Sequence, residues 1–248
     1  MSTPWILLPG LAETPEEFDR VLELLPGRDI RVVDPWQTPV TASVDELRTA
    51  TKAGTPVRLA GHSIGGLAVL RWALTHPDEV ERLVLIDTSL TSESGWRWLY
   101  PGTRADRMIR AFLTFVGRTG LPRLIGPTLR RLLVWVGSAT NRDLLSKATA
   151  RARYGAPNSW LLFWDDLANS WTLAAEVESL LKNPPPDLPP TLFLVATGGS
   201  SRFTAKTWLA GQRELATKLN TTGVEVLSDS AHLVHLDSPD AIAKALTD

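Results

Sequence analysis

Six short apolar runs alternate along this chain with longer segments of helical pattern, and few folds accommodate that order. Each run is too short for a surface helix and is mostly apolar, which is typical of a strand buried inside a parallel sheet. The predicted strands are Trp5–Leu8, Ile30–Val33, Val57–Ala60, Leu83–Ile86, Thr191–Val195 and Val224–Leu227. Because helical segments separate successive strands, the pattern predicts an α/β fold with a six-stranded, mostly parallel sheet flanked by helices.

Capping residues and prolines mark the limits of several predicted helices. Pro15 follows Thr14, a typical N-cap residue, and acidic residues occupy the turn after it. The pair Ser238 and Pro239 starts the last helix in the same way. This last helix is predicted to span Ala241–Leu246, and two further helices are predicted at Val44–Ala53 and Ile64–Thr75.

One long stretch, from about Thr91 to Leu181, contains no convincing strand. It carries amphipathic helical pattern rich in Trp, Leu and Arg, and it leads into a proline-rich extended segment, residues 183–190. We therefore expect a helical insertion that covers the C-terminal edge of the sheet. The predicted division is a core formed by residues 1–90 and 186–248, with a helical cap formed by residues 91–185.

Composition excludes several classes of function. The formal net charge of −1 gives no overall attraction to nucleic acid. Cysteine is absent and histidine occurs four times, so neither a disulfide nor a metal site with several histidines is expected, and nothing indicates a cofactor. The N-terminus runs directly into the first apolar run, unlike a signal peptide, and no window reaches the ~20 apolar residues of a spanning helix. We therefore expect a cytoplasmic protein without an integral membrane segment.

The segment Val57–Gly66 passes from a predicted strand to a predicted helix with almost no loop. Its central residue, Ser63, would occupy a strained turn that lifts the side chain above the sheet. Gly61 and Gly65 leave room for the crowded backbone of such a turn. Ser63 would also lie at the N-terminus of a helix, where the peptide dipoles favour developing negative charge. The segment therefore predicts that Ser63 is the nucleophile of a hydrolase-type enzyme.

Three blocks of sequence carry a resemblance to a known family. They are Leu7–Leu11, Gly61–Gly66 and Ala231–Pro239. With these motifs the chain resembles the α/β-hydrolase superfamily, and the resemblance covers nearly everything outside the helical insertion. It implies that the insertion corresponds to the family's cap or lid, between the sixth and seventh strands of the usual numbering. The first two strands of the full family sheet have no counterpart here.

A serine hydroxyl needs a neighbouring base to become a nucleophile at neutral pH. His232 follows the predicted strand Val224–Leu227, which is where the resemblance places the catalytic histidine, and it comes last in the chain order of the family. His62 precedes Ser63 and should point away from it. His235 is expected to pack or hydrogen-bond behind the His232 loop.

Acyl transfer also requires hydrogen-bond donors for the oxyanion. The resemblance implies that the backbone amide of Ile64, directly after the nucleophile, is one donor. It implies that the amide of Leu11, in the turn after the first strand, is the other. Many relatives have His-Gly in that turn, whereas this chain has Pro9-Gly10, but an amide beyond the glycine is unaffected by the change.

The carboxylate that orients the base departs from the usual pattern of the family. Relatives place it after the seventh strand, but here the segment Ala196–Phe203 contains no carboxylate. Asp87 ends the predicted strand Leu83–Ile86, and a minority of the superfamily has its acid at this position. An aspartate there can also be a simple turn-capping residue. The alternatives to Asp87 are a Ser-His dyad and a weakly active, degenerate site.

The predicted cap is strongly basic and rich in tryptophan. Between Trp96 and Arg153 there are eleven Arg and one Lys against Asp106 and Asp143, a net charge of +10. Six of the ten tryptophans lie in the cap region: Trp96, Trp98, Trp135, Trp160, Trp164 and Trp171. They predict a pocket for a small ester-like substrate with an apolar acyl or aromatic group. The arginines indicate either peripheral membrane contact or an ordinary solvent face, with the apolar residues packed on the sheet.

These features together predict a serine hydrolase of carboxylic esters, of the carboxylesterase, lactonase or thioesterase type. Ser63 would form the acyl-enzyme, with His232 as the base, Asp87 as the acid and Ile64 and Leu11 as oxyanion donors. One alternative is a cofactor-free lyase or C–C bond hydrolase that uses the same Ser-His pair. Another is a non-catalytic binding protein on the α/β-hydrolase fold.

Overall fold

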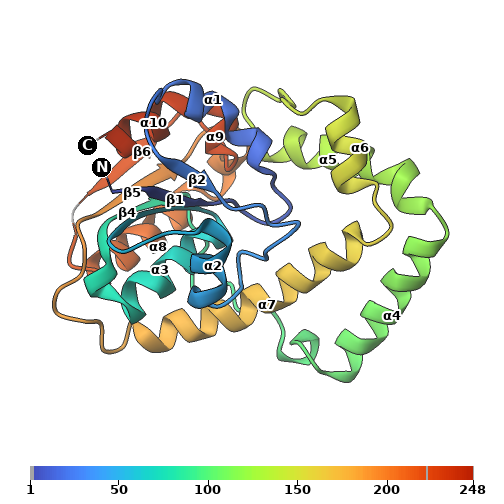
Figure 1. The fold of residues 1–248 in the computed structure, drawn as a ribbon, viewed down its shortest axis with the longest axis horizontal. Helices are drawn as coiled ribbons and strands as arrows, with labels where there is room; N and C mark the ends of the chain where they lie inside the picture. Colours follow the sequence, from blue (N-terminus) through green and yellow to red (C-terminus); the bar gives the residue numbers. More distant parts are fainter. Residues whose placement is uncertain (1–2, 222, 248) are drawn as a thin grey trace.

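The computed structural model describes residues 3–221 and 223–247 and contains one six-stranded sheet (Figure 1). All neighbouring strands are parallel, in the order β2-β1-β3-β4-β5-β6. The strands are β1 (Trp5–Leu8), β2 (Ile30–Val32), β3 (Val57–His62), β4 (Val80–Ile86), β5 (Thr191–Ala196) and β6 (Val224–Leu227). All six predicted strands are confirmed, although β3 continues to His62 and β4 begins three residues earlier than predicted.

The helices of the core largely follow the predicted pattern. They are η1 (Pro15–Phe18), α1 (Asp19–Glu23), α2 (Val44–Thr51), α3 (Ile64–Thr75), η2 (Pro77–Glu79), η4 (Gly199–Phe203), α8 (Ala205–Lys218), α9 (Val234–Asp237) and α10 (Pro239–Thr247). The helix after Thr14 begins as a 3₁₀ turn, in which the Thr14 amide donates to the Glu17 carboxylate at 2.9 Å. Helix α2 ends two residues earlier than predicted because Lys52 adopts a left-handed conformation, with φ of 50°.

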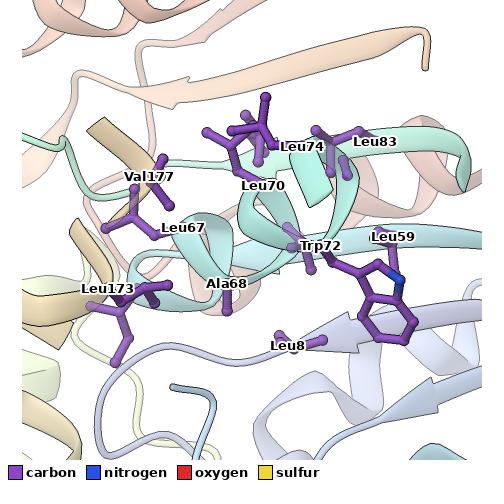
Figure 2. Close-up of a cluster of buried hydrophobic side chains, with 14 of the residues drawn as sticks. Leu8, Leu59, Leu67, Ala68, Leu70, Trp72, Leu74, Leu83, Leu173 and Val177 are labelled. Atoms are coloured by element: carbon purple, nitrogen blue, oxygen red, sulfur yellow. The ribbon is translucent and has the colours of Figure 1, made fainter. Parts of the chain in front are cut away.

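The two faces of the sheet bury different side chains because successive residues of a strand point in opposite directions. Ile6 and Leu8 pack with α3 on one face, whereas Trp5 and Leu7 pack with Phe18 on the other. Figure 2 shows the first of these clusters, in which side chains of α3 lie between strand residues such as Leu8 and residues of α7 such as Leu173. Helix α3 is buried along almost its whole length, which holds its N-terminus firmly against the sheet.

A helical insertion lies between β4 and β5. It contains η3 (Arg97–Leu99), α4 (Arg104–Arg118), α5 (Leu121–Gly137), α6 (Lys147–Tyr154) and α7 (Ser159–Leu180). Helix α7 returns to the core, where Leu173 and Val177 are buried against α3 (Figure 2). The other three α-helices and the first half of α7 extend away from the sheet (Figure 1). In the described part of the chain, no helix is long and apolar enough to cross a membrane.

Candidate active site

Ser63 is the single residue between β3 and α3. Its backbone has φ of 53° and ψ of −121°, a conformation that is costly for a residue with a β-carbon. A β-carbon at Gly61 would collide with the backbone of Gly65, and one at Gly65 would collide with the carbonyl oxygen of Leu8. The close approach of strand and helix therefore requires both glycines, and it leaves the Ser63 side chain at the C-terminal edge of the sheet.

A continuous chain of hydrogen bonds joins Ser63 to Asp87. Nε2 of His232 lies 3.0 Å from Oγ of Ser63, and Nδ1 of His232 lies 2.6 Å from Oδ2 of Asp87. The other oxygen of Asp87 accepts hydrogen bonds from the amide of Ala196 at 2.9 Å and from the indole of Trp208 at 2.8 Å. The structure thus brings the three side chains predicted as nucleophile, base and acid into contact in that order.

The order of the strands explains why Asp87 reaches His232. Strand β4 lies between β3 and β5, so the residue after β4 opens onto the same sheet edge as Ser63. Asp87 has φ of 40° and is 2% exposed, which directs its carboxylate inward under the His232 loop. Trp208 of α8 was not anticipated from the sequence. Its contact with Asp87 joins positions 121 apart in the chain, and no local pattern signals such a contact.

The two predicted oxyanion donors, Leu11 and Ile64, face the same cavity as Ser63 and His232. This cavity has a volume of about 310 Å³, and its wall includes Trp171 of α7. Among the described residues, neither amide donates a hydrogen bond to a protein acceptor. Both amides are therefore available to a bound group at the mouth of the Ser63 turn.

A second set of polar residues is buried directly behind His232. Nε2 of His62 lies 2.7 Å from the carbonyl oxygen of His232, and Nδ1 of His62 lies 2.6 Å from a carboxylate oxygen of Glu13. The other oxygen of Glu13 accepts the amide of Gly10 at 2.6 Å. Because both ring nitrogens of His62 face acceptor oxygens, the arrangement suits a doubly protonated ring paired with the Glu13 carboxylate.

The pKa values of this pair agree with an ion pair. Burial acts to raise the pKa of Glu13, but the neighbouring His62 and His235 side chains and the amide of Gly10 overcome it and lower that pKa to about 2. Burial acts to lower the pKa of His62, but the adjacent Glu13 carboxylate raises it overall. His62, Glu13 and His235 each offer one possible metal-ligand atom within 4.8 Å of the others. The direct contact between His62 and Glu13 also fits an ion pair.

Buried contacts connect the cap to the segment that follows β1. Arg130 of α5 forms an ion pair with Glu17, and both side chains are almost fully buried. The hydroxyl of Tyr154, on α6, donates to the carbonyl oxygen of Ala12 at 2.6 Å. Ala12 is held in a left-handed conformation with φ of 58° and follows the predicted oxyanion donor Leu11. The cap therefore contacts the loop that carries one of the two amides.

A second cavity, of about 490 Å³, lies between the cap helices and the core residues Ala12 and Trp36, and we name it the cap cavity. Its wall is formed by Ala12, Trp36, Ile109, Phe112, Leu113, Gly126, Leu129, Arg130, Leu132, Leu133, Tyr154, Ser159, Trp160, Phe163 and Trp164. Trp160 and Trp164, two of the tryptophans predicted to line a pocket, are in this wall, whereas Trp171 lines the cavity beside Ser63. Trp96, Trp98 and Trp135 are exposed instead. Helix α7 contributes to both cavities, with its first half in the wall of the cap cavity and residues from Leu167 onward in the wall of the cavity beside Ser63.

Comparison with known proteins gives consistent matches. A model of the Alpha/beta hydrolase family matches residues 6–245. The chain is 29% identical to the sn-1-specific diacylglycerol lipase ABHD11 of Mus musculus and 26% identical to that of Danio rerio. The alignments cover 77% and 99% of this chain and 58% and 78% of those proteins. The chain thus spans less than two thirds of the length of the mouse protein.

A solved structure shares the same architecture. An alpha/beta hydrolase fold protein from Burkholderia ambifaria superposes with a TM-score of 0.70 at 19% sequence identity. The superposition covers 99% of this chain and 90% of that one. At this identity the likeness concerns the fold alone.

Proposed function

This chain belongs to the alpha/beta hydrolase family, and within it we propose a serine hydrolase that cleaves carboxylic esters through an acyl-enzyme on Ser63. The observation that carries the proposal is the chain of hydrogen bonds from Ser63 through His232 to Asp87. A serine, a histidine and a carboxylate in this order form the arrangement that activates a hydroxyl for attack on an acyl carbon.

Each group at the site has a role in the proposed reaction. Oγ of Ser63 attacks the acyl carbon while Nε2 of His232 takes the hydroxyl proton. The amides of Leu11 and Ile64 donate to the oxyanion that forms. The alcohol leaves with the proton that His232 held, and a water molecule then repeats these steps to release the acid. Throughout, Asp87 accepts a hydrogen bond from Nδ1 of His232 and stabilises the imidazolium.

The shape of the two cavities supports an ester with an apolar acyl or aromatic part. The cavity beside Ser63 has both polar and apolar walls, which suits the ester group and its immediate surroundings. The cap cavity beyond α7 is almost wholly apolar. The diacylglycerol lipases to which the chain is similar act on esters of this chemical class.

An activity-based probe tests the proposal directly. The folded protein is treated with a fluorophosphonate, and the modified peptide is located by mass spectrometry. We expect the adduct on Ser63, together with a burst of nitrophenolate from p-nitrophenyl butyrate, and we expect both to disappear in Ser63→Ala. A folded wild-type protein that is not labelled on Ser63 would contradict a nucleophilic serine. Labelling without a burst or turnover would instead indicate different chemistry on the same pair.

A further inference from the structure

Large apolar side chains are exposed on two helices of the cap, α4 and α5. Met108, Phe112, Phe115, Leu124, Leu132 and Trp135 are each more than half exposed, and together we name them the cap apolar face. Isolated exposed apolar residues are common, but six large ones on two adjacent helices are unusual for a surface in contact only with water. One expectation from the sequence was that the apolar residues of the cap pack on the sheet, but these six side chains are exposed instead.

The members of the cap apolar face lie on one side of each helix and meet at the cap cavity. Met108, Phe112 and Phe115 follow the three- and four-residue spacing of a single helical face. Phe112 of α4 and Leu132 of α5 are exposed and also line the cavity, so its mouth opens on this face. Figure 1 shows α4 and α5 to the right of the sheet, with α7 running out from the core toward them.

The charge around the cap apolar face is positive and unpaired. Arg104, Arg107 and Arg118 are separated by three and eleven residues, which places them along one side of α4. Arg123 and Arg131 lie on α5. All five are exposed, and none forms an ion pair with a described residue. The single acidic residue of these two helices, Asp106, is buried and bound to Arg110.

This combination of apolar and cationic side chains identifies the chemistry of the partner. A second copy of the chain would bring its own arginines against these arginines, and the face offers no carboxylate to pair with them. An anionic lipid surface complements both features, because headgroup phosphates bind arginine and the acyl boundary accepts Phe, Leu and Trp. We propose that the cap apolar face docks the protein on an anionic lipid surface, with the mouth of the cap cavity against the lipid. The proposal does not depend on the reaction at Ser63.

Sedimentation with vesicles measures the proposed docking. One set of vesicles contains phosphatidylcholine alone, and the other contains phosphatidylcholine with 30% phosphatidylglycerol. We expect the wild-type protein to bind the second set, with an affinity that falls as salt is added. Each arginine near a charged surface changes affinity by about fivefold, so R104Q/R107Q/R118Q should weaken binding by roughly 100-fold. L124S/W135S should weaken binding at least ~10-fold through lost apolar burial.

A matched control uses the same kinds of substitution elsewhere on the surface. Arg20, Leu24 and Arg28 are exposed on and after α1, outside the cap. The variant R20Q/L24S/R28Q should bind vesicles like the wild type. The arginine triple variant should hydrolyse a soluble ester such as p-nitrophenyl butyrate at the wild-type rate, which separates docking from the reaction at Ser63.

Three results would overturn the proposal. The first is equal binding to both sets of vesicles. The second is an equal loss of binding in the control variant. The third is a dimer in light scattering that L124S/W135S dissociates, with no vesicle binding by the wild type. In that case a second copy, and not lipid, would cover this face.

Discussion

The substitution Asp87→Asn tests the least expected member of the proposed triad with a change of one atom. Oδ1 of Asp87 accepts two hydrogen bonds, from the amide of Ala196 and the indole of Trp208. An asparagine must keep its oxygen on these two donors, because its NH₂ group there would leave both donors without an acceptor. Each buried donor left unpaired costs about 1–3 kcal/mol, so the reversed amide is disfavoured by roughly 2–6 kcal/mol. The asparagine NH₂ therefore faces Nδ1 of His232.

An NH₂ group at this point changes the tautomer of His232. Nδ1 must then accept a hydrogen bond, and the ring proton moves to Nε2, which faces Oγ of Ser63 at 3.0 Å. In this tautomer the ring cannot take the hydroxyl proton. Loss of the correct tautomer in a serine hydrolase lowers kcat by about 10⁴-fold, equivalent to about 5.4 kcal/mol at 1.36 kcal/mol for each factor of ten.

The assay is kcat for a p-nitrophenyl ester together with the rate of fluorophosphonate labelling. We expect both rates to fall while the melting temperature stays close to that of the wild type. The matched control is Asp166→Asn, which neutralises another buried carboxylate, bonded to Thr41 and not to His232. If Asp87→Asn keeps kcat within about tenfold of the wild type, Asp87 is not the acid. A Ser-His dyad would then be the correct description.

Four further predictions concern other buried residues. Glu13→Gln removes the charged partner of the buried His62 and should lower the free energy of unfolding by about 3–5 kcal/mol. This corresponds to a fall in melting temperature of roughly 6–20 °C in scanning calorimetry, and an unchanged value would contradict the ion pair. The pKa of Glu13 is lowered to about 2, so its ionised form stabilises the fold fully above the unfolded pKa of about 4.3 and this contribution is lost as pH falls towards 2. The free energies of unfolding in urea at pH 3 and pH 6 should therefore differ less in Glu13→Gln than in the wild type. Gly65→Ala places a β-carbon against the backbone oxygens of Leu8 and Pro9 at the end of β1. It should lower the free energy of unfolding by at least ~1–3 kcal/mol and lower the activity. Full activity at wild-type stability would refute the crowded turn. Burial raises the pKa of Asp166 to about 6, so the contribution of this group to stability is present at low pH and is lost as pH rises through 6. Asp166→Asn should therefore be more stable than the wild type at pH 8 and lose that advantage at pH 4. The opposite order would show that the raised pKa is wrong.

The local features of this chain were readable from the sequence because they depend on neighbouring residues. Strands such as Trp5–Leu8 and Val224–Leu227 have the predicted limits, since runs of apolar residues between turn residues can be buried only as strands in such a chain. The turn at Ser63 was equally clear, because the glycines at 61 and 65 are required by the contact between β3 and α3. Boundaries failed where a single backbone conformation decided them, as at Lys52.

The contacts that complete the site join residues far apart in the chain. Asp87 and His232 are 145 positions apart, and only the placement of β4 next to β3 and β5 brings that aspartate under the His232 loop. The support from Trp208 had no counterpart in any local pattern. The ion pair of Glu13 with His62 was also absent from the sequence analysis, because Glu13 reads there as one acid among several near the start of a helix.

Some properties of the cap follow from its sequence, and others depend on how its helices are placed. Its helical character and its positive charge were evident from composition and spacing alone. Whether Phe112, Leu132 and their neighbours pack on the sheet or face outward depends on how the helices are placed, and an amphipathic pattern is the same in both cases. The sequence by itself thus determined the strands, the Ser63 turn and the basic helical insertion, since short-range packing and backbone sterics act along the chain. The tertiary structure alone decided which distant side chains meet at Ser63 and which cap residues stay exposed, because those contacts depend on the packing of whole elements.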